Sequence, residues 1–561
     1  MSIFTRTAIN RFRYMYRTTS PLQWLISPRP ISEPFFQFNG TTTTTDRFIS
    51  PRPFSTPLQC HFSSYYSSSS NVDDFPTGDF NFKPLTGFNK FLVMLKTMLA
   101  LPWERVQRGS VLKIILQGRI SDQLSSTLCD PNLLSLPEIC DNFLKATYDP
   151  RILAVYLHIH TLNCGWAKLD EIRRQISNFR KSGKMVVAYL PFIGPKEYYI
   201  ACACDEIFAP PVAAVSLFGF AVNNYSFGRG WYHNPYDDFE VSREALTALV
   251  DNIHSNWVDK VSSAIGKRRE EVENFMLKGL YEVDTLKEEG FISSLAYDDQ
   301  IVTFLEGRLG VKSFSSISFT RYSHVRKWTL GLADAKISMA KELIAIIRAS
   351  GSIGSYINAK KFIEEIRMLK ASCRIKAVII RIDCADYNLR PSKQIWEEIR
   401  SLAAQKPVIA SMSDVAASAG YYIAMGAGTI VAENLTITGS IGGAVTQNLN
   451  LENLYEPIHL KEIVRRGTLR STNTLFEELF AREDHDYIHF RANAALSRSM
   501  TIDKLEEVAH GRVWTGKDAL SHGLVDAIGG ISRAIAIAKL KANIPQNRQV
   551  TVVELSISVK D

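Results

Sequence analysis

The sequence has little of what would mark a membrane-spanning, disulfide-linked or metal-binding protein. No uninterrupted apolar run reaches the about 20 residues that a membrane-spanning helix needs. Eight cysteines among 561 residues are too few for a disulfide framework. Cys202 and Cys204 have no second pair at metal-ligand spacing, so we expect them to be small core residues. No metal constellation and no phosphate-binding glycine loop occurs, and no cofactor is predicted.

Lysine is absent from the first 72 residues, and carboxylates are nearly absent. Seven arginines stand against Glu33 and Asp46, which places +5 of the net charge of +8 in this segment. Residues 41–45 are all threonine and residues 67–70 all serine. This composition cannot form a core and is typical of an organelle transit peptide, here residues 1–75; a disordered tail is the alternative. The composition alone does not separate chloroplast from mitochondrion.

The rest of the chain carries too little positive charge to indicate a nucleic-acid partner. About +3 remains beyond the N-terminal segment, and no basic stripe interleaved with aromatic residues is found. We therefore predict no nucleic-acid binding.

The dominant positive feature is an internal repeat. Shifting the chain by 223 residues places Ala154-Val155 on Ala377-Val378 and Tyr198–Ala201 on Tyr421–Ala424. Such a register indicates two copies of one domain, assigned to residues 76–310 and 337–561 and joined by a polar linker over 311–336.

Each copy alternates β-rich runs with segments of helical periodicity. This order predicts an α/β fold with parallel sheets and right-handed crossover helices. The expected strands are 111–116, 153–159, 186–190 and 207–209, then 343–348, 377–382, 408–412 and 429–432; the expected helices lie around 136–144, 169–179, 198–201, 362–369, 395–402 and from 418 onward.

The two copies differ where chemistry is expected. In the second copy a strand is predicted to end near Met412, with a short loop before Ser418 opens a helix among alanines and glycine. A serine there can attack a carbonyl while neighbouring N–H groups hold the oxyanion. The first copy has Pro195 at that position. Without further context, a helix N-cap is the ordinary role of such a serine.

Two local features complete the pattern. Thr515 and Asp518 form a predicted capping box at the start of a helix, and Gly523 is expected to end that helix. The apolar segment Phe91–Trp103 is interrupted by Lys96, and it suits either a helix on a membrane surface or one packed on its own domain.

The stretches Asp414–Tyr422, Thr438–Gly442, Gly511–Gly516 and Gly523–Asp526 resemble the signal peptide peptidase A (protease IV) family in its long tandem form, and are similar to its plant chloroplast members. The resemblance implies two tandem crotonase/ClpP-like domains and a serine peptidase with a Ser–Lys dyad. It assigns the nucleophile to Ser418, and we expect the Ala419 N–H at the oxyanion site.

The resemblance also implies substrates, an assembly and a location for the chain. They are peptide or protein substrates, a bowl-like homo-oligomer (a tetramer), peripheral membrane association, and a chloroplast location at the thylakoid membrane or in the stroma. A mitochondrial location is the alternative.

The chain departs from the family pattern in two places. The family's base lysine follows the segment matching Phe218–Phe220, yet residues 218–259 contain no lysine, and Arg465–Arg470 has none at the short-form position. Asp386 and Tyr387 stand where the family has two glycines of the oxyanion loop. A carboxylate there would oppose an oxyanion. The general base is thus unknown.

Other basic side chains have no spacing that places them at Ser418. His233 and Lys461 are the nearest candidates, and each is expected to be a solvated surface residue. His158 and His160 lie in a predicted strand and are expected to be structural.

The sequence therefore predicts a serine-type endopeptidase that cleaves peptides or membrane-derived protein fragments through an acyl-enzyme. The alternative is a catalytically impaired homologue that binds peptides or joins oligomers. A crotonase-type acyl-CoA enzyme is a minor alternative, because related folds host different chemistries.

Overall fold

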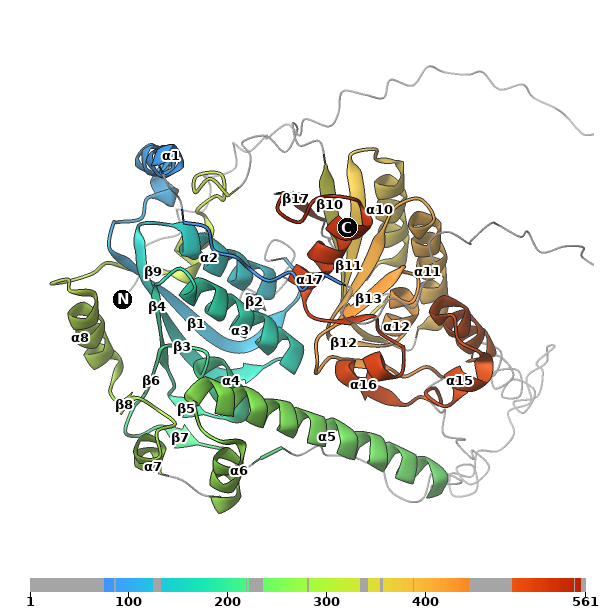
Figure 1. Ribbon diagram of the computed structural model, residues 1–561, viewed down its shortest axis with the longest axis horizontal. Coiled ribbons are helices and arrows are strands. Elements are labelled where there is room, and N and C mark those ends of the chain that lie inside the picture. Colours follow the sequence, from blue (N-terminus) through green and yellow to red (C-terminus); the bar gives the residue numbers. More distant parts are fainter. Residues whose placement is uncertain are drawn as a thin grey trace, which may run out of the picture. The chain divides into compact units, whose positions relative to one another are not determined.

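The computed structural model of the protein describes residues 75–84, 87–124, 133–217, 219–220, 236–279, 282–332, 342–353, 357–386, 388–442, 487–548 and 550–555. Residues 1–74 of the predicted transit peptide, His233, Tyr387 and Lys461 lie outside the described residues. Figure 1 shows the chain coloured along its sequence.

The first copy of the repeat contains short and long strands that alternate with helices. The strands are β1 (Ser110–Ser121), β2 (Leu134–Ser135), β3 (Ile152–Asn163), β4 (Met185–Tyr189), β5 (Phe192–Ile193), β6 (Glu206–Ala209), β7 (Ala214–Val215), β8 (Ser294–Leu295) and β9 (Ser316–Ser318). The helices are α1 (Gly87–Met98), the 3-10 turn η2 (Pro102–Glu104), α2 (Leu136–Tyr148), α3 (Trp166–Arg180), α4 (Pro195–Ala201), α5 (Tyr236–Ile265), α6 (Arg269–Lys278), α7 (Val283–Glu288), α8 (Asp298–Leu309) and α9 (Phe319–Ser323).

The second copy repeats this order. Its strands are β10 (Leu343–Ser350), β11 (Ile375–Asp386), β12 (Val408–Ser418), β13 (Thr429–Ala432), β14 (Ile437–Gly439), β15 (Val513–Thr515), β16 (Ala527–Ile528) and β17 (Thr551–Leu555). Its helices are α10 (Ala359–Ala371), α11 (Leu389–Ala403), α12 (Ala419–Ala424), α15 (Ile502–Glu506), α16 (Gly516–Ser521) and α17 (Ile531–Lys541), with a further helical stretch over residues 487–498.

Each copy folds around its own parallel-rich sheet (Figure 1). The first sheet has the strand order β2-β1-β3-β4-β6-β8, with β9 added beside β1. The second has the order β15-β14-β12-β11-β10-β17, with β13 joining β12 and β16. Only the β14–β15 pair among the described strands of these two sheets is antiparallel. The α/β fold class predicted from the sequence is confirmed.

Apolar faces of the helices build the cores on both sides of each sheet. In the first copy α2 and α3 cover one face, with Phe143 and Phe179 in edge-to-face contact, and α8 covers the other. In the second copy α10 and α11 cover one face and α17 the other. Cys202 and Cys204 are buried in the first core, as predicted.

The repeat extends to individual polar contacts. Lys184, just before β4, donates to the carbonyls of Ala146 (2.6 Å) and Asp149 (2.7 Å) where α2 ends. Lys406, just before β12, donates to the matching carbonyls of Leu369 (2.7 Å) and Ser372 where α10 ends. Both lysines satisfy carbonyls that a helix end leaves free.

Two expectations need correction. The sequence suggested a linker over 311–336, but β9 pairs with β1, and Ile317 and Tyr322 are buried in the first core, because the polar stretch carries apolar residues that fit that sheet. The sequence also predicted that the strand ends near Met412, whereas β12 continues to Ser418. The small residues after Met412 carry no clear β-pattern, although they pair with β11 and β14.

Helix α1 leaves most of its apolar side chains exposed. Val93 is buried, and Lys96 Nζ lies 4.7 Å from the centre of the Trp328 ring, so one face packs on the first copy. Phe88 and Met98 are 71% and 68% exposed. In the part of the chain that the structure describes, no helix combines the length and the apolar character that crossing a bilayer requires.

Candidate active site

Ser418 lies at the junction between β12 and α12 in a strained backbone conformation. Its φ is 53° and its ψ is −113°, and its residue is only 4% exposed. A positive φ is costly for a residue with a side chain and persists only where the surroundings enforce it. The hydroxyl makes no capping hydrogen bond to α12, so the ordinary N-cap role is not the one this serine plays.

The backbone beside Ser418 is packed too tightly for a larger residue. A Cβ added to Gly420 would lie 2.2 Å from the Cys384 carbonyl oxygen of β11. The small residues that the sequence places after Ser418 therefore allow α12 to start directly against the neighbouring strand.

Within the described ranges, no lysine or histidine nitrogen hydrogen-bonds to Ser418 Oγ. Lys184 has a pKa lowered to about 8 by burial, but it lies before β4, at the opposite end of its strand from the junction that matches Ser418. His158 and His160 stack on each other at 4.5 Å inside β3, as expected for structural residues. Burial, and then the neighbouring His160, lower the pKa of His158 to about 4.

Asp386 pairs with Ser418 in the β11–β12 ladder, but its carboxylate has donors of its own. Oδ2 accepts from Ser352 Oγ at 2.7 Å and from the Ile353 N–H at 2.6 Å, and Oδ1 accepts from the Asn388 N–H at 3.3 Å. These donors compensate much of the negative charge. The carboxylate that was expected in the oxyanion loop thus holds the chain segment that follows β10.

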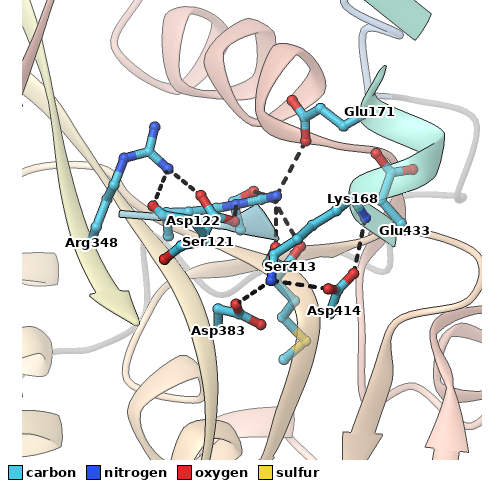
Figure 2. Close-up of polar contacts among 12 residues, drawn as sticks. Ser121, Asp122, Lys168, Glu171, Arg348, Asp383, Ser413, Asp414 and Glu433 are labelled. Carbon is cyan, nitrogen blue, oxygen red and sulfur yellow. Dashed lines mark hydrogen bonds and ion pairs between the residues drawn. The ribbon is translucent and has the colours of Figure 1, made fainter. Parts of the chain in front are cut away.

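Lys168 of α3 reaches from the first copy into the second, where it lies between two carboxylates (Figure 2). Its Nζ is 2.7 Å from Asp383 Oδ2 and 3.0 Å from Asp414 Oδ2, and the residue is 6% exposed. Burial alone would lower the pKa of Lys168, but Asp383 and Asp414 outweigh it and raise the pKa. Lys168 therefore stays protonated and cannot act as a general base.

Arg381 of β11 lies beneath the same region, fully enclosed. Its guanidinium donates to Asp122 Oδ2 (2.9 Å) and Glu171 Oε2 (3.2 Å), which both belong to the first copy. It also donates to the Met412 carbonyl at 3.0 Å and the Ser413 hydroxyl at 3.1 Å. The two copies thus share one buried ionic cluster next to β12.

Other charges of this cluster also pair across the two copies. Asp122 accepts from Arg348 of β10, and Arg174 lies 2.6 Å from Glu433. Burial would raise the pKa of Asp122, but Arg381, Arg348 and Lys168 outweigh it and lower the pKa to about 2. Figure 2 shows Asp122, Arg348, Glu171 and Glu433 around this cluster.

Sequence reasoning singled out Ser418 but missed the cluster around Lys168 and Arg381. One signal was present: in the repeat register His158 and His160 fall on Arg381 and Asp383, so the second copy has charges where the first has aromatic rings. Of the predicted capping box the N-cap half is found, because Thr515 Oγ1 accepts from the Asp518 N–H at 3.2 Å, whereas the Asp518 carboxylate accepts from the Thr515 hydroxyl. Gly523 follows α16 with a φ of +73°, as expected.

Comparison with known proteins defines the class. The model of peptidase family S49 matches residues 400–545. The chloroplastic serine protease SPPA of Arabidopsis thaliana is 49% identical over 532 residues, which cover 87% of this chain and 77% of that protein. Protease 4 of Haemophilus influenzae is 26% identical over 468 residues, which cover 76% and 75% of the two chains.

A mutant of the 1510-N membrane-bound stomatin-specific protease in complex with a substrate peptide has a TM-score of 0.26 and 22% identity, covering 40% of this chain and 96% of that one.

The fold and the sequence matches together define an α/β serine peptidase. The chain belongs to peptidase family S49, the signal peptide peptidase A (protease IV) family. This confirms the family resemblance and sets aside the crotonase-type acyl-CoA enzyme.

Proposed function

We propose that Ser418 is the nucleophile of this serine peptidase. Its Oγ attacks the carbonyl carbon of a peptide bond, and the Ala419 N–H stabilises the oxyanion that forms. Collapse of the tetrahedral intermediate releases the amine and leaves an acyl-enzyme, which water hydrolyses. The general base that takes the Ser418 proton is not assigned.

The observation that carries this proposal is the strained backbone of Ser418. A serine with a φ of 53° at a strand-to-helix junction, without a capping bond, costs stability that an ordinary surface serine does not. Such strain is typical of nucleophiles held at a sharp strand–helix turn. Membership of family S49 supports the same assignment.

A fluorophosphonate probe tests the proposal, because serine Oγ displaces fluoride from its phosphorus atom. We expect stoichiometric labelling of the full chain and none in Ser418→Ala. Ser440→Ala is the matched control, since Ser440 also has a positive φ, of 51°, and directly follows strand β14. Labelling that persists in Ser418→Ala would remove Ser418 as the nucleophile.

One sequence feature favours a second candidate, a catalytically impaired homologue that binds peptides. Residues 218–259 and the segment Arg465–Arg470 lack the family lysine. The same experiment separates the candidates. Absence of labelling in a folded wild-type chain, beside a labelled active relative, supports the impaired homologue.

We further propose that the chain acts in the chloroplast, as its relative from Arabidopsis thaliana is called chloroplastic. The acid-poor segment 1–75 supports import, and uptake of a reporter fused to it by isolated chloroplasts, but not mitochondria, tests this. We also propose that the chain forms a homo-oligomer, a tetramer by family resemblance. Sedimentation velocity measures its size, and a monomer would contradict this proposal.

Peripheral binding to the thylakoid membrane is the proposed role of α1. The exposed apolar side chains of α1, together with Trp103, support this role, because amphipathic helices bury such faces at the headgroup boundary.

A further inference from the structure

Strand β12 contains a bulge just before Ser418. In the ladder with β11, Ile382 pairs with Met412, but the next pair is Cys384 with Ala416. Three residues of β12, 413–415, thus lie opposite the single residue Asp383. A bulge interrupts ladder hydrogen bonds and redirects the strand beyond it, and bulges are frequent next to active sites.

Side chains from the first copy hold this bulge. The Asp414 carboxylate accepts from the Gly165 N–H at 2.7 Å and from the Lys168 N–H at 2.9 Å, at the start of the 15-residue helix α3. Lys168 Nζ adds the ion pair with the same carboxylate. A Cβ on Gly165 would lie 2.4 Å from Asp414 Cγ, so this approach requires a glycine.

Asp383 links the same lysine to the backbone of the bulge. Its Oδ2 binds Lys168 Nζ, and its Oδ1 accepts from the Val415 N–H at 3.3 Å. Lys168 therefore binds Asp414 directly and the Val415 N–H through Asp383. Ser418 follows Val415 by three residues. About 13 Å of extended strand separates Asp414 from Ser418, so the lysine acts on the serine through the strand.

The arrangement is not duplicated in the repeat, because the first copy has neither aspartate and the second copy has no counterpart of Lys168. In the repeat register Asp383 falls on His160, Asp414 on Pro191, and Lys168 on Pro391 of α11. The copy without the two aspartates is also the copy that has Pro195 in place of Ser418. The two aspartates that bind Lys168 thus occur only in the copy that carries the candidate nucleophile.

We propose that Lys168 is a positioning residue of the peptidase, which, through Asp383 and Asp414, fixes the bulge of β12 and thereby the strained conformation of Ser418. The first copy then contributes to catalysis by setting the geometry of the second. This inference rests on the proposed role of Ser418.

The kinetic test compares two lysine variants in the full chain. Lys168→Met removes the ammonium between the aspartates, whereas Lys184→Met removes a half-buried lysine that caps α2. We expect Lys168→Met to lower the maximal rate constant of fluorophosphonate acylation per folded molecule by on the order of a hundredfold, with a smaller change in the half-saturating probe concentration. Lys184→Met should lower thermal stability and leave that rate constant within twofold.

Lys168→Arg, which keeps the charge, should recover most of the acylation rate. A Lys168→Met enzyme that acylates as fast as wild type, or an equal loss in Lys184→Met, would overturn the proposal.

Hydrogen exchange provides a measurement that needs no activity. Amides of residues 413–420 should exchange at least tenfold faster in Lys168→Met than in wild type. In Lys184→Met their exchange rates should equal those of wild type. Unchanged protection in Lys168→Met refutes the positioning role. If wild type is not labelled while the exchange result holds, the proposed nucleophile fails and the role of Lys168 in fixing the bulge stands.

Discussion

Gly420 in the first turn of α12 and Gly428 after that helix differ in the space that they leave for a side chain. At Gly420 an added Cβ would lie 2.2 Å from the Cys384 carbonyl oxygen, whereas at Gly428 the nearest atom, the Val408 carbonyl oxygen, is 3.8 Å away. The first distance is impossible without a backbone shift, and the second is an ordinary contact. The residue that follows Ser418 by two positions is therefore fixed by sterics.

We expect Gly420→Ala to push α12 away from β11 and to lower the free energy of unfolding by about 2 kcal/mol. Because Ser418 precedes α12, fluorophosphonate labelling should also slow. Gly428→Ala serves as the control and should change stability by less than about 0.5 kcal/mol. Urea unfolding measures the first effect and labelling rates the second; equal behaviour of the two variants would contradict the steric argument.

At the scale of elements, α1 stands apart from the other helices. A soluble domain buries most of the apolar side chains of its helices, yet Phe88, Phe91 and Met98 of α1 are 71%, 60% and 68% exposed. Val93 is buried and Lys96 Nζ lies over the Trp328 ring, so these two side chains face the first copy. An exposed apolar face of this kind suits a partner that accepts hydrocarbon, such as a lipid surface.

The double variant Phe88→Glu/Phe91→Glu should abolish co-flotation of the protein with vesicles of thylakoid lipids, because two carboxylates cannot enter the acyl region. Met368→Glu is the control, since Met368 is 63% exposed on α10, far along the chain from α1. Co-flotation that survives the double variant would exclude α1 as the membrane-binding element.

At the scale of the whole molecule, the buried ionic cluster ties the two copies together. Asp122 of the first copy binds Arg381 and Arg348 of the second, and its pKa is lowered to about 2 although burial alone would raise it. A carboxyl whose folded pKa lies below its unfolded value stabilises the fold above the unfolded pKa of about 4. This contribution is lost as the pH falls from about 4 to about 2.

Asp122→Asn should therefore lower the free energy of unfolding by about 2 kcal/mol at pH 7, and the difference from wild type should shrink below pH 4. Urea unfolding at pH 7, 4 and 3 measures this trend. Asp251→Asn, an exposed change in α5, is expected to stay within about 0.5 kcal/mol of wild type. A difference for Asp122→Asn that is independent of pH would contradict the charge pairing.

The sequence by itself determined the two-copy α/β architecture and the candidate nucleophile. The register of 223 residues and the apolar runs located β1, β3, β10 and β11, because hydrophobic periodicity is a local property of the chain. Ser418 stood out because its neighbours are small and because the other copy has Pro195 in its place.

Only the tertiary structure decided how β12 reaches Ser418 and what holds it there. The mixed small residues 413–417 carry no β-pattern, and their strand forms because β11 and β14 pair with them. Lys168 and Asp414 are 246 positions apart, and nothing local marks them as partners. Burial enforces that pairing, because a charge removed from water is costly unless an opposite charge or a hydrogen bond compensates it.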